Sequence, residues 1–223
     1  MSAVNADVEA EIDRSARDKY WANFYQHNKV GVPVYPSQFA AFAINEFHQV
    51  DGVIEFGCGN GRDSHFFASN GFQLLALDES EQAIKLCRLH NQHDHAQYIA
   101  CRASAAHQQV EGFLLGKHRV AVYARFFLHA IEENEQHEFF SLLGALLPMG
   151  SFLFLEYRTI EDAHQEKIFG TGHYRRYLDH RKTLAAIEKA GFSITYEVEG
   201  RGLAKYKDED ASVGRCVAMK GCP

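Results

Sequence analysis

Short apolar runs alternate with stretches of helical periodicity along most of the chain. The run at 72–77 is almost wholly apolar, which is typical of a strand buried on both faces of a parallel sheet, and the segment at 52–56 is also strand-like. The stretches between runs carry apolar residues three or four positions apart, as helices with one buried face do. The pattern predicts strands at 52–56, 72–77, 98–101, 119–123, 151–157, 192–198 and 213–219, and helices at 5–29, 37–47, 62–70, 80–91, 134–147 and 182–190.

The regular alternation of strands and helices predicts the fold class. Repeated strand-helix-strand units give a parallel sheet that is covered by helices on both faces. The last two strands have no helix between them, so we expect them to form an antiparallel pair at one edge. No boundary or repeat divides the sequence, and we expect one domain over residues 1–223.

Composition and charge exclude several classes of protein. The 223 residues suffice for one core, and 46% hydrophobic with 23% charged residues is ordinary for a folded domain. The net charge of -6 offers no general attraction for nucleic acid. The sequence has no apolar run long enough to cross a bilayer and no signal-like N-terminus. Five scattered cysteines indicate reduced thiols, so we expect a cytoplasmic protein.

The most informative segment is a glycine-rich turn after the first core strand. It reads Glu55-Phe56-Gly57-Cys58-Gly59-Asn60-Gly61-Arg62-Asp63, and its glycines allow the backbone to approach a ligand closely. Arg62 stands where a dinucleotide-binding turn has its third glycine, and the sequence contains no nucleoside triphosphate loop motif. Asp78 follows the second strand, 21 residues after Gly57, where a carboxylate binds ribose hydroxyls. The combination suits an adenosine attached to an amino acid rather than to a diphosphate.

On these residues the chain resembles the class I S-adenosylmethionine-dependent methyltransferases, over roughly residues 50–220. The segment GCGNGRDS, which begins at Gly57, looks most like bacterial members that modify small molecules or glycans. The resemblance implies a Rossmann-like, doubly wound α/β sheet of seven strands, mainly parallel with one antiparallel edge strand and with helices on both faces. It also implies that residues 1–50 form a helical lid and residues 51–223 the α/β core.

The resemblance further implies S-adenosylmethionine as the cofactor. The turn from Gly57 to Gly61 would pass under the methionine part, and Asp78 would hold the ribose. Arg102 departs from the family, which usually has an acid after the third strand, near the adenine amino group. The expected cofactor-binding residues are Tyr20, Trp21, Glu55, Gly57, Cys58, Gly59, Gly61, Arg62, Asp63, Asp78, Glu79, Ser80, Ala103, Ser104 and Ala124.

The acceptor is expected at the carboxyl ends of the fourth and fifth strands, where such sheets have their ligand crevice. Arginines gather there and in the loop that follows, and their paired donors suit carboxylate or phosphate. We therefore expect an anionic small molecule or saccharide, such as a phosphorylated or nucleotide-linked sugar or a glycan end. The alternative is that some of the arginines only pair with Glu156, Glu161 or Asp162. The expected substrate-binding residues are Tyr25, Arg125, Tyr157, Arg158, Tyr174, Arg175 and Arg176.

A hydroxyl acceptor also needs a group that removes its proton, and methylation at oxygen is favoured. The candidates are His129, Glu156 and His173, which all follow strands on the expected acceptor side. His129 is the first choice for this role. Alternatively, His129 only caps the helix that follows it.

Two other functions compete with this interpretation. An NAD(P)-dependent oxidoreductase of related fold is disfavoured by Arg62 at the position of the third fingerprint glycine. A non-catalytic partner subunit of methyltransferase fold would keep the glycine turn and have an apolar, blocked acceptor side. His90, His93 and His95 lack the spacing of a zinc site, so we expect no metal.

Overall fold

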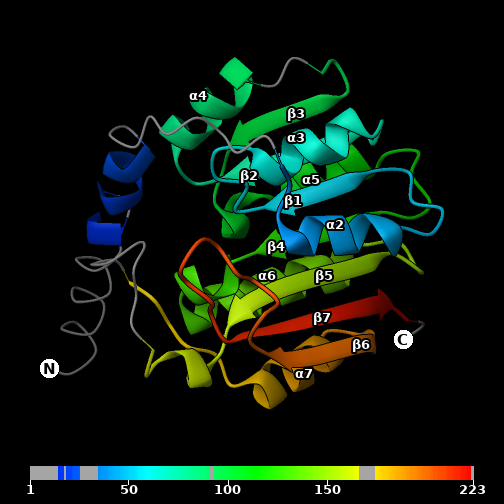
Figure 1. Cartoon of the computed structure of the whole chain (residues 1–223). Helices are drawn as coiled ribbons and strands as arrows, with labels where there is room; N and C mark the ends of the chain where they lie inside the picture. The colour runs from blue at the N-terminus through cyan, green and yellow to red at the C-terminus, as the bar shows by residue number, and fades with distance from the viewer. Residues whose placement is uncertain (1–14, 18, 26–34, 91–92, 166–173, 222–223) are drawn as a thin grey trace, which may run out of the picture.

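A computed structural model describes residues 15–17, 19–25, 35–90, 93–165 and 174–221 of the chain. Seven strands form one sheet in the order β3-β2-β1-β4-β5-β7-β6 (Figure 1). The strands are β1 (Val53–Phe56), β2 (Leu74–Asp78), β3 (Ala96–Ala100), β4 (Ala121–Arg125), β5 (Phe152–Arg158), β6 (Phe192–Gly200) and β7 (Val213–Lys220). The helices are α2 (Gln38–Asn45), α3 (Arg62–Ser69), α4 (Glu81–His90), α5 (His107–Leu114), α6 (Glu133–Leu146) and α7 (His180–Lys189), with 3₁₀ turns η1 (Ala103–Ala105), η2 (Leu128–Ala130) and η3 (Ile160–Asp162). Residues 15–17 and 19–25 are also helical and are called the N-terminal helix below.

The directions of the strands confirm the predicted fold class. The strands β3, β2, β1, β4 and β5 pair in parallel, whereas β7 runs antiparallel to both β5 and β6. The last two strands therefore form the antiparallel end of the sheet, as the missing helix between them predicts. The sequence pattern does not predict α5, because only Val110 and Phe113 of this helix are buried and its apolar stripe is short.

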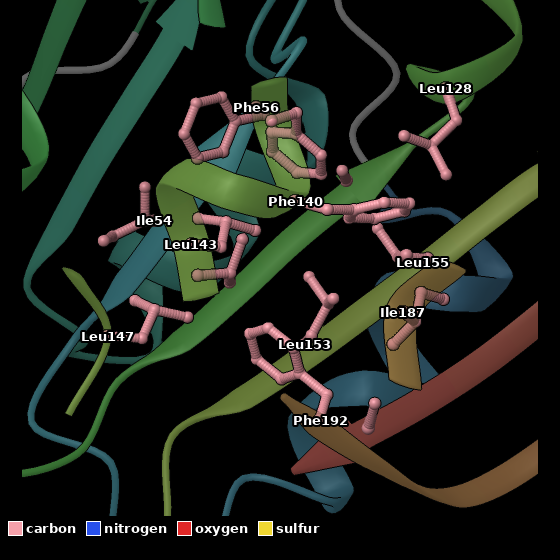
Figure 2. Packing of buried hydrophobic residues seen from close by; sticks show 14 of the residues in the cluster. Ile54, Phe56, Leu128, Phe140, Leu143, Leu147, Leu153, Leu155, Ile187 and Phe192 are labelled. Carbon is pink, nitrogen blue, oxygen red and sulfur yellow. The ribbon is translucent and has the colours of Figure 1, made fainter. Parts of the chain in front are cut away.

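Apolar side chains cover both faces of the sheet, as a doubly wound fold requires. On one face, Ile54 of β1 belongs to a cluster with Phe140 of α6 and Ile187 of α7 (Figure 2). On the other face, the neighbouring Val53 packs in a second cluster with Phe39 of α2 and with residues of α3 and α4. Successive residues of β1 thus face opposite layers. Both layers are packed with buried apolar side chains, which fix the positions of the strand ends.

Ser37 caps α2, as the sequence predicts, and also ties this helix to α3. Its hydroxyl oxygen accepts a hydrogen bond from the Ala40 N–H at 3.0 Å. The same hydroxyl donates to Oδ2 of Asp63 at 2.7 Å, and the Ser37 N–H donates to Oδ1 at 2.8 Å. One residue therefore fixes both the start of α2 and the first turn of α3, next to the glycine turn.

The strand order reverses between β1 and β4, and open α/β sheets bind ligands at such a point, outside the carboxyl ends of the strands. The N-terminal helix lies beyond this edge of the sheet, in blue in Figure 1. The connection between β6 and β7 returns to the same edge. Within the described part of the chain, no helix is both long and apolar enough to cross a membrane.

Candidate active site

The glycine turn after β1 forms one wall of the site, and its glycines are required by both conformation and space. Gly57 has a φ of 70° and Gly59 a φ of 56°, in the left-handed region that residues with a Cβ avoid. A Cβ on Gly57 would lie 3.0 Å from a ring carbon of Phe127. A Cβ on Gly59 would lie 2.7 Å from the hydroxyl oxygen of Tyr25. The turn therefore needs glycine at both positions, because Phe127 and Tyr25 pack directly against it.

Asp78 ends β2 beside this turn. Its Oδ2 accepts a hydrogen bond from the Gly59 N–H, and its Oδ1 accepts one from the Ser80 N–H, both at 2.9 Å. Burial raises the pKa of Asp78, while the two backbone hydrogen bonds act in the opposite direction. Each carboxylate oxygen has a second lone pair, so the group retains capacity to accept from two ribose hydroxyls. The geometry fits the role that the sequence predicts for Asp78.

Two further carboxyl groups, those of Glu55 and Asp63, lie close to the turn, and their pKa values are shifted in opposite directions. Burial and the nearby charge of Asp63 raise the pKa of Glu55 well above its usual value. Burial also opposes ionisation of Asp63, but the charges of Arg62 and Arg125 and the bonds from Ser37 outweigh it and lower the pKa. Glu55 therefore ionises less readily than Asp63, whose charge is held by hydrogen bonds from Ser37 and Tyr123.

A cavity of about 1050 Å³ opens at the reversal point between β1 and β4. Pockets for one drug-sized ligand are typically about 300–1,000 Å³, so this cavity has room for a cofactor and a small acceptor. Its β2 side carries the glycine turn and Asp78, and its β4 side carries the segment after β4 and part of the β6–β7 connection. The predicted cofactor-binding residues that line it are Trp21, Glu55, Gly57, Cys58, Gly59, Arg62, Asp63, Asp78, Glu79, Ala103 and Ser104.

The other predicted cofactor-binding residues are placed behind the wall of this cavity. Gly61 is the N-cap of α3, with a φ of 81°. The Ser80 hydroxyl accepts a hydrogen bond in the first turn of α4. Ala124 is buried in the core cluster shown in Figure 2, and the Tyr20 ring packs edge-on against Trp21. The structure thus does not bring these four residues to the lining of the main cavity, and their direct contact with a cofactor stays a prediction.

The N-terminal helix contributes an aromatic wall. Trp21, Phe24 and Tyr25 line the cavity, and the Trp21 and Tyr25 rings stack with centroids 6.1 Å apart. Burial raises the pKa of the Tyr25 hydroxyl well above its usual value, and the negative charge of Asp78 adds to this shift. Tyr25 was a predicted substrate residue, and it lies over the glycine turn, on the β2 side of the cavity.

Arg17 holds the N-terminal helix against the core. Its two Nη atoms donate to the two carboxylate oxygens of Glu135 in α6, both at 2.9 Å. Its Nε lies 3.8 Å from Oε1 of Glu79, which directly follows β2. Glu79 also lies 3.9 Å from Arg102, the residue that departs from the family pattern after β3. Arg17 thus connects the two sides of the cavity through one buried guanidinium.

The β4 side of the cavity combines aromatic rings with positive charge. Arg125 ends β4, and its Nε donates to Oε1 of Glu156 at 2.7 Å. Its guanidinium carbon lies 4.1 Å from the centre of the Phe126 ring. Tyr206 and Lys207 reach the same cavity from the β6–β7 connection. The sequence shows that connection only as a turn-rich link, so it contains no signal that these two residues face the site.

The predicted cluster of substrate-binding arginines is wrong for Arg158, which is 6% exposed. Its Nη1 donates to Asp162 at 2.7 Å, and its Nη2 donates to Glu209. The alternative of ion pairing within the fold therefore holds for this residue. Its neighbour Tyr157 is fully buried and shares a 2.9 Å hydrogen bond with Nδ1 of His180, away from the cavity.

The loop before α7 also departs from the predicted cluster. The Arg176 side chain bonds the backbone of η2 and the side-chain oxygen of Gln136, at 2.6 Å for the latter. Tyr174 and Arg175 are half-buried in the same segment. Among the described residues of the predicted arginine cluster, the cavity is lined by Arg125 alone.

Two of the three candidate bases are held in ways that disfavour proton removal. Glu156 is 1% exposed, and its two oxygens accept from Nε of Arg125 and Nε of Arg215 at 2.7 and 2.6 Å. Nδ1 of His129 accepts the Arg158 N–H at 3.2 Å, so the neutral ring carries its proton on Nε2 and presents no free lone pair. The third candidate, His173, lies outside the described residues.

His65 and His93 lie near each other beside α3, with ring centroids 5.5 Å apart. His95 is close to His93, but its Nε2 hydrogen-bonds the Ala68 carbonyl oxygen at 2.9 Å. Across the described ranges, no three His, Cys, Asp or Glu side chains are grouped as ligands of a metal ion.

Comparison with known proteins agrees with this geometry. Residues 53–150 match the model of a family described as the methyltransferase domain. No curated protein matches the chain. A SAM-dependent methyltransferase from Anabaena variabilis has a TM-score of 0.69 and 19% identity, with 92% of this chain and 94% of that chain covered.

Two other solved structures share the fold at similar identity. The first is a structure described as the conversion of a disulfide bond into a thioacetal group during echinomycin biosynthesis. It has a TM-score of 0.66 and 14% identity, and the match covers 94% of this chain and 92% of that chain. The glycopeptide N-methyltransferase MtfA, in complex with S-adenosylmethionine, has a TM-score of 0.61 and 15% identity, covering 86% and 98%. The family match over residues 53–150 and the shared fold support a class I S-adenosylmethionine-dependent methyltransferase, as the glycine turn and Asp78 predict.

Proposed function

We propose that this methyltransferase methylates an oxygen of a small-molecule or glycan-type acceptor that carries negative charge. The observation that carries the proposal is the division of the cavity between two chemically different sides. The β2 side has the glycine turn and Asp78, and the β4 side has Arg125, aromatic rings and Lys207. The first side suits an adenosine with an amino-acid tail, and the second suits an anion with an apolar body.

The residues of the β2 side fit S-adenosylmethionine. The glycine turn lines the cavity directly beside Asp78, which keeps lone pairs for ribose hydroxyls. When bound, the cofactor supplies a methyl group on a positively charged sulfur. Transfer of such a group depends mainly on positioning the acceptor, so the rigid strand ends and the aromatic wall of the N-terminal helix support this chemistry.

The choice of oxygen is supported by the charge of the β4 side. Arg125 and Lys207 would stabilise the oxyanion of an acceptor hydroxyl and lower its pKa. They favour an acceptor that is already anionic or that ionises easily. Glu156 pairs with Arg125 at 2.7 Å but is shared with Arg215 at 2.6 Å, and Glu135 is paired with Arg17 at 2.9 Å, so these acids do not cancel the positive charge of this side. The polar lining also speaks against a partner subunit with an apolar, blocked acceptor side.

Calorimetry with S-adenosylhomocysteine and with NADH tests the cofactor. We expect the thioether to bind and NADH not to bind, since the turn lacks the third fingerprint glycine. Asp78→Asn should weaken binding of the thioether by at least about tenfold, the equivalent of one lost hydrogen bond to a charged group. Asp94→Asn, the same change at an exposed turn, is the matched control. Binding of NADH without binding of the thioether would refute the proposal.

A further inference from the structure

Two residues on the β4 side of the cavity have a strained backbone. Phe126 has a φ of 55° and Lys207 a φ of 53°, and the third non-glycine residue of this kind in the described chain is Gln49. The left-handed region costs a residue with a Cβ about 1–2 kcal/mol, and such strain concentrates at ligand sites. Phe126 and Lys207 both line the cavity, although they are far apart in sequence. The fold therefore holds two unfavourable conformations beside one space.

A buried network fixes the position of Lys207. Tyr206 and Glu209 exchange two backbone hydrogen bonds of 2.8 and 3.0 Å, which close a tight turn around Lys207. The Glu209 carboxylate accepts from Nη2 of Arg158, whose Nη1 binds Asp162 at 2.7 Å. Asp162 in turn accepts the Ser212 N–H at 2.9 Å, at the end of the same connection. The turn is thus anchored to the end of β5 and does not depend on its own packing alone.

Phe126 joins this turn to the segment after β4. Its ring packs against a small apolar cluster that contains Ala204, Ala211 and Val213, from the β6–β7 connection and the start of β7. The Arg125 guanidinium lies 4.1 Å from the centre of this ring, and the Lys207 ammonium lies 5.4 Å from the centre of the Tyr206 ring. Arg125 is therefore a largely buried cation beside an aromatic ring, where water screens charge less than in bulk, and Lys207 is an exposed cation that lines the same cavity.

We propose that the turn 206–209 recognises the acceptor, with Lys207 and Arg125 binding its anionic group and Phe126 and Phe127 packing against its flat or apolar body. The inference rests on the proposed function and gives it a substrate class, a small acceptor with a carboxylate or phosphate group. Lysine provides a compact positive charge that suits either group. The strain at Lys207 places this charge at the cavity, and Arg158 acts as a positioning residue for the turn.

The test compares two pairs of probes that differ in charge. The first pair is dihydroxybenzoate and dihydroxybenzamide, and the second is glucose phosphate and glucose. Binding of each probe to the complex of the protein with S-adenosylhomocysteine is measured by calorimetry. We expect the charged member of at least one pair to bind about tenfold tighter than its neutral partner. Preference within the first pair assigns an aromatic acid, and preference within the second assigns a sugar phosphate.

The variant Lys207→Asn removes the charge while keeping a residue that tolerates the left-handed region. It should abolish the preference for the charged probe and leave binding of S-adenosylhomocysteine unchanged. Lys207→Arg should restore the preference. Lys205 is exposed on the same connection and does not line the cavity, so Lys205→Asn is the matched control.

The outcomes separate this inference from the function on which it rests. Equal binding of charged and neutral probes, or equal effects of Lys207→Asn and Lys205→Asn, would overturn the inference while binding of S-adenosylhomocysteine persists. Absence of any probe binding to that complex would overturn it too. Failure of S-adenosylhomocysteine itself to bind would instead overturn the proposed function.

Discussion

Arg17 provides a direct test of whether the N-terminal helix acts as a lid. The residue is 4% exposed and forms a two-pronged ion pair with Glu135, with a third contact to Glu79 at 3.8 Å. Arg17→Met keeps much of the apolar stem and removes the charge. The substitution leaves both acids without their shared partner, at the point where the helix meets the core.

The size of the effect follows from burial. Removing one partner of a buried ion pair costs about 3–5 kcal/mol. The side chains of Glu135 and Glu79 retain 13% and 23% exposure, so water can reach them and the lower end applies. About 3 kcal/mol corresponds to a roughly hundredfold shift in the docking equilibrium of the helix. Because the cavity wall includes Trp21 and Tyr25, affinity for S-adenosylhomocysteine should fall when a smaller fraction of the N-terminal helix is docked.

Trp21 is a specific reporter, since the chain contains one tryptophan. In Arg17→Met we expect its emission to shift to longer wavelength as it becomes exposed, and calorimetry should show weaker binding of S-adenosylhomocysteine. Arg17→Lys keeps the charge without the two-pronged geometry, so its emission wavelength and its affinity should lie between those of Arg17→Met and the unchanged chain. Arg181→Met, at an exposed arginine of α7, is the control for loss of charge. Unchanged emission and affinity in Arg17→Met would refute the role of this ion pair.

Two further predictions concern the support of the glycine turn. Ser37→Ala removes the cap of α2 and a hydrogen bond to ionised Asp63, so urea unfolding should show a loss of about 2–4 kcal/mol. The exposed Ser193→Ala should change little, and equal stabilities would contradict the reasoning. Burial raises the pKa of Glu55 above 4.5, so the folded chain keeps a proton that the unfolded chain loses, and stability falls as pH rises from about 4.5 through the raised pKa. Glu55→Gln cannot lose this proton, so its free energy of unfolding in urea, relative to that of the unchanged chain, should rise by up to about 1.4 kcal/mol per pH unit in this range. If the two free energies of unfolding change in parallel with pH, the pKa of Glu55 is not raised.

Local signals in the sequence predict correctly that the glycine turn and Asp78 lie together. The glycine turn and Asp78 lie on consecutive crossover units, so their chemistry and their spacing along the chain are enough to bring them together. The departure at Arg102 is also visible in the sequence, but its partner is not. Only the fold shows that Arg102 lies near Glu79, which itself lies near Arg17 of the N-terminal helix.

The β4 side could not be predicted in the same way. Arg125, Arg158 and Arg176 look equivalent in sequence and all three are bound within the fold, yet only Arg125 among them also lines the cavity. The difference depends on carboxylates and carbonyl groups that approach from other parts of the chain, such as Glu209, about 50 residues from Arg158. A charge pattern along one segment does not contain this information.

The sequence by itself determined the α/β class, the parallel core and the meeting of the glycine turn with Asp78, because periodicity and a glycine turn are local properties of the backbone. Tertiary structure alone decided which ionisable groups face the cavity. It buried Glu156 between two arginines, oriented His129 through a backbone N–H and brought Lys207 to the site by an anchored turn. These outcomes depend on long-range pairing, since a buried charge is stable only where the fold supplies its partner.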